Sequence, residues 1–288
     1  MARVATVAMA IVVLNVGLAG QTATHQPQRL PDGQPDIQGA YTGSDSAVNL
    51  DRTAPGFEIA GKPPAYDNVW AHDRPGGSQG NRLPGPQIID PIDRVMPYRP
   101  WALEKKSALL RGYLLDRHGD VESVDPMVRC VPQGPPRSNM FLSYNGYHFV
   151  QPPGHVLILS ETNHVYRTIP LNGQPHLTPK IHLYRGDSRG RWEGSTLVVE
   201  TTNNAGGGWF DMVGSFYTDA LRVVERYTIS SSKRIDYEAT IDDPAVFTRQ
   251  WQLASFFEKA GEGYEIYEYA CQEGNDTVRS LMTRSIDR

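Results

Sequence analysis

Prolines divide this chain into two unlike parts, since 18 of its 22 prolines precede residue 154. Proline lacks the backbone N–H that a sheet ladder needs, and clusters such as Leu30–Gly33 and Arg74–Gly77 add glycines that weaken strands. Residues 21–99 are therefore not expected to form regular sheet. Disordered linkers are poor in aromatic residues, so the aromatic side chains of this part favour an extended, proline-rich arm wrapped over a core. They are Tyr41, Phe57, Tyr66, Trp70 and Tyr98.

From Tyr147 onward the sequence carries runs typical of β-strands, separated by turn residues such as Asn172-Gly173. No helical pattern lies between the runs, so they predict a mainly β, antiparallel meander. The expected architecture is a lipocalin-like barrel or half-barrel, with a two-sheet β-sandwich as the alternative. The expected strands are Val156–Glu161, Val165–Leu171, Thr196–Thr202, Ala220–Ile229, Arg234–Ile241, Arg249–Glu258 and Gly263–Cys271.

One helix is expected within residues 100–118, starting at Pro100 in the sequence PWALEKKSALLRGYLLD. Proline suits the first turn of a helix, and Ala102, Leu103, Leu110 and Leu114 lie near one face. The chain is thus expected to comprise a signal peptide (1–20), the arm (21–99), the helix (100–118) and a β-barrel-like core (119–288). Arm, helix and core are expected to form one integrated unit.

The N-terminus has the order of a secretory signal. Arg3 precedes an apolar run from Val4 to Ala19, and small and then polar residues follow it. The alternative is a membrane anchor, but the run of about 16 residues is shorter than the roughly 20 needed to span a bilayer. We therefore expect cleavage near residues 19–23, export to the periplasm or extracellular space, and no stable membrane insertion afterwards.

Cys130 and Cys271 are the two cysteines of the chain. In an exported protein two cysteines most economically form one disulfide. The bridge would close a loop of about 140 residues and contribute roughly 4–5 kcal/mol in the chain-entropy model. Two buried thiols or a thiol nucleophile are the alternatives, although no neighbouring residue would lower the pKa of a nucleophile.

Glu225 breaks the alternation of its strand. Leu221, Val223, Tyr227 and Ile229 occupy the same face of the strand, so Glu225 is expected to point with them toward the core or the barrel interior. A carboxylate there needs an arginine partner or a raised pKa. It is a candidate general acid or base, and the alternatives are a buried Glu–Arg pair or an exposed outer face.

Histidines gather between residues 118 and 182, yet their spacing matches no metal motif. His164 is the most notable of them, because it follows Glu161 by three residues and precedes Arg167 by three. We consider His164 as a second proton carrier, and Arg167 or Arg226 as the group that sets the charge of Glu225. No metal site and no cofactor are expected.

Two glycine-rich segments carry candidate ligand-binding residues. In the first, Trp192 either plugs a barrel end or stacks on a ligand, and Asp187 either faces a site together with Glu193 or stabilises a corner. In the second, Trp209 follows Gly206–Gly208, a run that forms either a lid or a long hairpin loop.

The chain's charge excludes one class of partner. The formal net charge is −4 and no Lys/Arg run is longer than two residues, whereas nucleic-acid binders usually carry a strongly basic face. No nucleic-acid partner is expected. The sequence does not indicate an oligomeric state.

Several motifs resemble those of a large group of uncharacterised exported bacterial proteins, common in acidobacteria and proteobacteria. They are PDIQG at Pro35–Gly39, GDSRGRWEGSTLVV at Gly186–Val199, TIDDP at Thr240–Pro244 and EYACQEGN at Glu268–Asn275. The resemblance covers nearly the whole mature chain and implies an exported, single integrated unit, without naming a catalytic residue. Gln272 departs from the His expected in similar proteins.

Three functions remain open. The first is an acid–base enzyme, a hydrolase or lyase acting on a small aromatic or glycosidic compound at the barrel mouth, with Glu225, His164 and Arg167 catalytic and Trp192, Trp209, Arg226 and Asp187 binding the substrate. The second is a non-catalytic, lipocalin-type protein that binds a small-molecule ligand. The third is a periplasmic interaction protein that works through its arm.

Overall fold

The computed structural model describes residues 25–43, 50, 88–114, 121–140, 146–276 and 278–279. The signal peptide expected over residues 1–20 lies outside these ranges, as do Phe57, Tyr66 and Trp70 of the arm and the end of the expected helix after Leu114.

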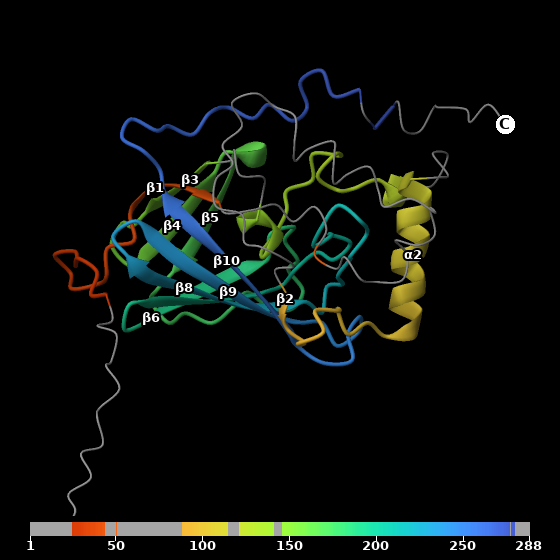
Figure 1. The fold of residues 1–288 in the computed structure, drawn as a ribbon, viewed down its shortest axis with the longest axis horizontal. Coiled ribbons are helices and arrows are strands. Elements are labelled where there is room, and N and C mark those ends of the chain that lie inside the picture. The colour runs from red at the N-terminus through yellow and green to blue at the C-terminus, as the bar shows by residue number, and fades with distance from the viewer. Residues whose placement is uncertain are drawn as a thin grey trace, which may run out of the picture.

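The described strands form one antiparallel sheet (Figure 1). Its order is β5-β4-β3-β1-β10-β9-β8-β7-β6, and β2 pairs with β10 beside this path. The strands are β1 (Gly39–Gly43), β2 (Ile88–Asp90), β3 (Gly146–Val150), β4 (His155–Ser160), β5 (Val165–Pro170), β6 (Asp187–Glu193), β7 (Thr196–Thr202), β8 (Arg222–Ser231), β9 (Arg234–Asp242) and β10 (Trp251–Lys259). The helices are α2 (Pro100–Leu114) and the 3₁₀ turns η2 (Val121–Ser123), η3 (Arg137–Asn139) and η4 (Thr162–His164).

The sheet curls until its two outer strands, β5 and β6, face each other, and this nearly closes a barrel. No backbone ladder joins β5 to β6 in the described part of the chain, so a seam remains between them. A Cβ on Gly190 of β6 would lie 2.6 Å from Ile169 Cγ2 of β5 and 2.8 Å from Leu171 Cδ2. Glycine at this position therefore lets the two outer strands approach. The predicted antiparallel barrel or half-barrel is confirmed, and the two-sheet sandwich is excluded.

The expectation that the arm contains no sheet is wrong. The arm contributes β1 and β2, which lie in stretches without proline between Pro35 and Pro55 and between Pro86 and Pro91. Strand β1 lies between β3 and β10, pairing Tyr41 with Tyr147 on one side and with Lys259 on the other. The arm thus completes the middle of the sheet.

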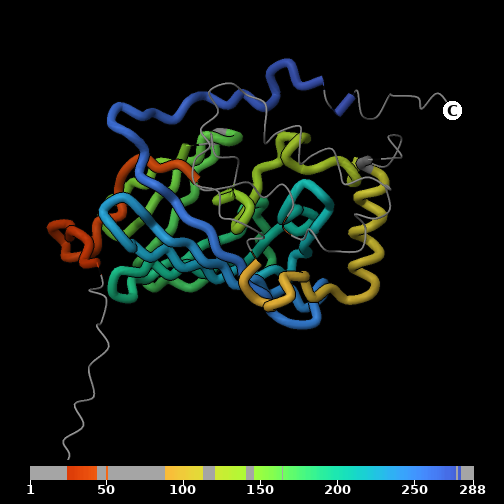
Figure 2. The backbone as a smooth tube through the Cα atoms, in the orientation of Figure 1, coloured from red at the N-terminus to blue at the C-terminus, as the bar shows by residue number. Residues whose placement is uncertain are grey.

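The strand expected at Gly263–Cys271 is also wrong. Strand β10 already has β9 and β1 as neighbours, so it offers no free edge on the main path of the sheet to a further strand. The segment instead crosses β3, where a Cβ on Gly146 would lie 2.5 Å from the hydroxyl oxygen of Tyr264. Figure 2 shows residues after β10 running along one side of the molecule, away from the barrel.

Aromatic side chains fill the barrel interior. The ring of Phe257 on β10 lies 5.1 Å from that of Tyr147, 5.5 Å from that of Phe149 and 5.9 Å from that of Tyr237. Tyr227 stacks on the same ring at 6.1 Å. These side chains are buried, so the space between the strands is a packed core.

Helix α2 lies at the opposite end of the molecule from the β3–β5 strands (Figure 1). It begins at Pro100, as expected, and buries Ala102 and Leu110. Its exposed Trp101 packs on Phe216 with ring centroids 5.8 Å apart. The segment 205–219 therefore connects the helix to the barrel.

Candidate functional site

A polar cluster lies inside the barrel, centred on Arg167 of β5 and Glu225 of β8. The guanidinium of Arg167 donates to both carboxylate oxygens of Glu225, with Nη1 3.0 Å from Oε1 and Nη2 bonded to Oε2. The remaining donors of Arg167 reach Ser188 Oγ at 2.8 Å and Thr201 Oγ1 at 2.7 Å. Arg167 thereby connects β5 to β6, β7 and β8 across the seam.

Three further donors converge on the same carboxylate. Asn139 Nδ2 lies 2.7 Å from Glu225 Oε1, the Tyr227 hydroxyl 2.8 Å and the Tyr237 hydroxyl 3.0 Å. Both Arg167 and Glu225 are buried, with Glu225 0% exposed. Each is fully hydrogen-bonded, as a buried ion pair must be to offset its desolvation. We name this group the interior polar cluster; its members are Asn139, Arg167, Ser188, Thr201, Glu225, Tyr227 and Tyr237.

Burial and charge set the protonation of this cluster. Burial lowers the pKa of Arg167, but the charge of Glu225 and its hydrogen bonds outweigh this and raise that pKa. Burial, followed by the charge of Glu225, raises the pKa of Tyr227 and of Tyr237 well above the ordinary value. The two phenols therefore stay protonated and keep donating to the carboxylate.

A second feature lies outside the barrel. A pocket of about 450 Å³ opens between α2, residues 126–133 and residues 205–219, and we name it the helix-side pocket. None of the residues that line it belongs to a strand. Its aromatic lining residues are Trp101, Tyr184, Trp209, Phe216 and Tyr217, and its charged ones are Lys105, Glu122, Arg129 and Asp219.

Glycines shape one wall of this pocket. Gly206 and Gly207 have φ of 71° and 68°, a backbone conformation that favours glycine. A Cβ on Gly208 would lie 2.0 Å from the Tyr217 hydroxyl oxygen. Burial raises the pKa of Tyr217 to about 12. The run Gly206–Gly208 thus brings the backbone directly against a buried phenol.

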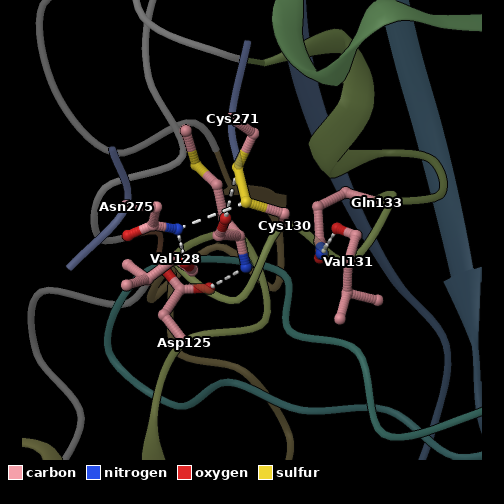
Figure 3. Close-up of a disulfide and its surroundings, with 8 residues drawn as sticks. Asp125, Val128, Cys130, Val131, Gln133, Cys271 and Asn275 are labelled. Atoms are coloured by element: carbon pink, nitrogen blue, oxygen red, sulfur yellow. Dashed lines mark hydrogen bonds between the residues drawn. A yellow bond between two sulfur atoms is a disulfide. The ribbon is translucent and has the colours of Figure 1, made fainter. Parts of the chain in front are cut away.

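Two polar groups of the pocket lack partners. Gln133 is 2% exposed, and its Oε1 has no hydrogen-bond partner in the described part of the chain. Its Nε2 donates to the Val131 carbonyl at 2.6 Å (Figure 3). Arg129 is half-buried, and its Nε is likewise unpartnered among the described residues. Buried polar groups are normally paired, so these two lining residues each carry a polar atom whose hydrogen bond is missing among the described residues.

The 3₁₀ turn η3 connects the pocket wall to the interior polar cluster. Arg137 forms a two-bond ion pair with Asp125, at 2.8 Å and 2.7 Å, and its Nη1 lies 3.5 Å from the Trp209 carbonyl oxygen. Two residues later, Asn139 donates to Glu225. One turn of backbone therefore joins the two features.

The disulfide between Cys130 and Cys271 is confirmed. Cys130 lies between Arg129 and Val131, both of which line the pocket. Asn275 Nδ2 donates to the Val128 carbonyl at 2.9 Å and lies 3.3 Å from Cys130 Sγ (Figure 3). The C-terminal segment is thus fastened to the wall of the helix-side pocket.

The remaining residues expected at a site lie elsewhere. Arg226 pairs with Glu193 at 3.0 Å, on the strand face opposite to Glu225, so Arg167 and not Arg226 sets the charge environment of Glu225. Trp192 donates from Nε1 to Gln34 Oε1 at 3.1 Å and packs on the core rather than the pocket.

Asp187 is held within a local polar network. It pairs with Arg189 at 2.6 Å and with His176 at 3.0 Å, and it accepts a hydrogen bond from the Leu177 N–H. For His164 only the backbone is described, at the end of η4. Its suggested proton-carrying role stays a prediction.

Trp209 is the candidate that lines the pocket, although it is buried at 2% exposure rather than exposed at the tip of a loop. Gln133 and Arg129 were not expected from the sequence. They lie in an irregular segment, MVRCVPQGPP, that has no periodic pattern, and its only signal is the cysteine itself.

Two features are absent from the described residues. These residues contain no group of three or more His, Cys, Asp or Glu side chains arranged to hold a metal ion. They also contain no helix that is both long and apolar enough to cross a membrane.

Comparison with known proteins adds little to this geometry. No family model matches the chain, and no curated protein matches its sequence. Among solved structures, a mutant of the fluorescent protein UnaG aligns at 11% identity with a TM-score of 0.25, over 47% of this chain and 86% of that chain. A likeness this low carries no argument about function, which has to come from the site itself.

Proposed function

We propose that this protein binds a small organic molecule in the helix-side pocket. The observation that carries the proposal is a pocket of about 450 Å³ lined in part by Gln133, whose buried amide oxygen has no hydrogen-bond partner among the described residues. Small-molecule sites typically measure about 300–1,000 Å³, are lined by aromatic side chains and contain a few well-placed polar groups. The pocket between α2 and the segment 205–219 fits this description.

Binding is better supported than acid–base catalysis. Glu225 accepts hydrogen bonds from Arg167, Asn139, Tyr227 and Tyr237, and it does not line the pocket. A general acid or base must come within hydrogen-bond reach of its substrate. The contacts of Glu225 are those of a structural ion pair.

The pocket's own lining also favours binding. No described His, Cys or Ser lines it, and its two carboxylates, Glu122 and Asp219, are exposed. Carboxylates that perform acid–base chemistry are usually desolvated within a cleft rather than exposed. We therefore propose a non-catalytic binding protein.

The test is a thermal-shift screen of the mature protein against phenolics, lipids and sugars, with calorimetry on any hit. Ala205 is an exposed pocket residue, and Ala205→Trp would fill the site. Ala245 is exposed and lies outside the pocket, so Ala245→Trp is the matched control. We expect Ala205→Trp to abolish binding and Ala245→Trp to retain it. Equal binding by the two variants would contradict the proposal.

Export is the second part of the proposal. The N-terminal leader pattern and the Cys130–Cys271 disulfide support it, because disulfides persist in oxidising compartments. Mass spectrometry of protein from the periplasm of a bacterial host should find a chain that begins near residues 20–24. An intact N-terminus in the cytosolic fraction would contradict export.

A further inference from the structure

The orientation of the Gln133 amide defines what a ligand must offer. Its Nε2 donates to the Val131 carbonyl at 2.6 Å, and a carbonyl oxygen can only accept a hydrogen bond. The amide cannot be reversed without losing this bond, so Oε1 is the atom left without a partner among the residues that the structure describes. An amide oxygen is an acceptor only. A ligand group that pairs with it must therefore be an O–H or N–H donor.

Arg129 sets a second requirement. It lines the pocket, and its Nε has no hydrogen-bond partner among the described residues. A guanidinium is always charged and donates in a planar fork that matches a carboxylate. The other lining cation, Lys105, packs over the Phe216 ring with its Nζ 4.9 Å from the centroid. Lys105 is exposed and Arg129 is half-buried, so Arg129 is the deeper cation of the pocket.

The carboxylates of the pocket do not cancel this preference. Two cations and two carboxylates line it, so its net charge is not positive. Glu122 and Asp219 are exposed, whereas Gln133 is buried and Arg129 is half-buried. Charges at an exposed rim are screened by water more than those deeper in a site. The deeper polar groups therefore decide which ligand is selected.

The rest of the lining favours a flat ring. Trp101 and Tyr184 are exposed lining residues that present aromatic surface, and the run Gly206–Gly208 presents bare backbone. Aromatic side chains prefer offset or edge-to-face contact with another ring. A planar aromatic ligand can use these contacts together with Arg129 and Gln133.

We infer that the helix-side pocket selects an aromatic carboxylate that also carries a hydroxyl or amino donor, with the carboxylate on Arg129 and the donor on Gln133 Oε1. This inference rests on the proposed binding function and names its ligand class. It separates such acids from neutral aromatics, sugars and lipids, which lack one or both groups.

The test is calorimetry with three matched probes: 4-hydroxycinnamic acid, cinnamic acid and methyl 4-hydroxycinnamate. The first has both groups, the second lacks the hydroxyl donor and the third lacks the carboxylate. Each omission should weaken binding about tenfold, because it leaves the half-buried Arg129 or the buried Gln133 without its ligand partner. Equal affinities for the acid and its ester would overturn the inference.

Variants assign the two contacts. Arg129→Gln should reduce the affinity for 4-hydroxycinnamic acid to that of its methyl ester and leave the affinity for the ester unchanged. Arg129→Lys should keep part of the difference in affinity between the acid and the ester. Gln133→Met should remove the advantage of 4-hydroxycinnamic acid over cinnamic acid. Arg191→Gln removes an exposed charge far from the pocket lining and should behave as wild type.

The outcomes also separate this inference from the proposed function. Suppose that none of the three probes binds, but another screened compound binds to wild type and not to Ala205→Trp. The ligand class is then wrong and the binding function stands. If no compound binds at all, both fail. An equal loss for all three probes in Arg129→Gln would overturn the carboxylate assignment, and Arg129→Gln tests it even if Gln133→Met does not fold.

Discussion

Arg167 on β5 and Glu225 on β8 form a buried ion pair although β6 and β7 lie between their strands in the sheet order around the seam. The pair joins residues 58 positions apart in sequence. It also reaches across a seam that no backbone ladder closes among the described residues. Side chains, rather than a ladder, therefore hold the two outer strands of the barrel together.

We expect Glu225→Gln to destabilise the fold by about 3–5 kcal/mol, because it leaves the Arg167 charge buried without a counter-charge. Urea unfolding followed by Trp fluorescence measures the loss. The affinity of the folded fraction for its ligand should stay within about twofold of wild type, since Glu225 does not line the pocket.

Replacing both partners of the ion pair provides the control for that prediction. Arg167→Met combined with Glu225→Gln removes both charges, so it should be less destabilising than Glu225→Gln alone. A fully stable Glu225→Gln protein that has lost binding would instead place Glu225 at the functional site.

Alkaline pH should destabilise the protein through its buried tyrosines. Burial raises the pKa of Tyr217 to about 12 from 10.0. Above pH 10 the unfolded chain releases this proton while the folded chain keeps it, so the unfolded state binds fewer protons and stability falls as pH rises. The slope is about 1.4 kcal/mol per pH unit for one group, up to pH 12.

The measurement is the difference between wild type and Tyr217→Phe in urea unfolding from pH 9 to 12. Burial and then the charge of Arg167 lower the pKa of Arg185 to about 10. Titration of Arg185 therefore makes stability rise with pH above that value, but it occurs in both wild type and Tyr217→Phe and cancels in their difference. Tyr166→Phe, at an exposed position, should follow wild type. Parallel curves for wild type and Tyr217→Phe would contradict the prediction.

Closure of the seam should depend on Gly190. A methyl group there would lie 2.6 Å from Ile169 Cγ2, and overpacking of this kind costs about 1–3 kcal/mol. We expect Gly190→Ala to lower the free energy of unfolding by that amount, and Ile169→Ala in the same chain to recover part of it. A Cβ on Gly261 would meet no described atom within 4 Å beyond its chain neighbours, so Gly261→Ala should be close to neutral in the same assay.

Local patterns predicted most of the barrel. The strand expected at Thr196–Thr202 is β7, with the same bounds, and alternation placed Glu225 on the buried face of β8. Alternation works here because each strand of a curled sheet has one face toward the core. The same alternation puts Arg226 on the face of β8 opposite to Glu225, so it argues against Arg226 as the partner. It does not show that Arg167 of β5 reaches Glu225, because that contact crosses the seam.

The strands and pocket residues that the sequence did not predict depend on contacts with residues far away in the chain. Strand β1 is five residues long and forms because β3 and β10, more than a hundred residues later in the chain, leave a gap that it fills. Strand β6 is interrupted by Gly190 and by charged residues, so it resembles a turn until Ile169 is packed against it. Gln133 and Arg129 acquire their place only when α2 and the segment 205–219 fold around them.

Loss of the disulfide should affect stability and binding together. The bond joins residues 141 positions apart, and removing it should cost about 4–5 kcal/mol in the chain-entropy model. Cys130 lies between Arg129 and Val131 of the pocket wall, so freeing this wall should also weaken ligand binding several-fold. Urea unfolding and calorimetry of the Cys130→Ser, Cys271→Ser double variant measure the two effects, with reduced wild type for comparison.

A second variant separates the covalent bond from the contacts around it. Asn275→Ala removes the hydrogen bond to the Val128 carbonyl and keeps the disulfide, so it should cost only about 0.5–1.5 kcal/mol and leave ligand affinity nearly unchanged. If the double variant instead binds its ligand as tightly as wild type, the disulfide stabilises the chain without shaping the pocket. The backbone N–H of Arg129 donates to the Asp125 carbonyl at 3.3 Å, and Asp125 pairs with Arg137. Asp125→Asn, with the disulfide intact, would then test whether this ion pair positions Arg129.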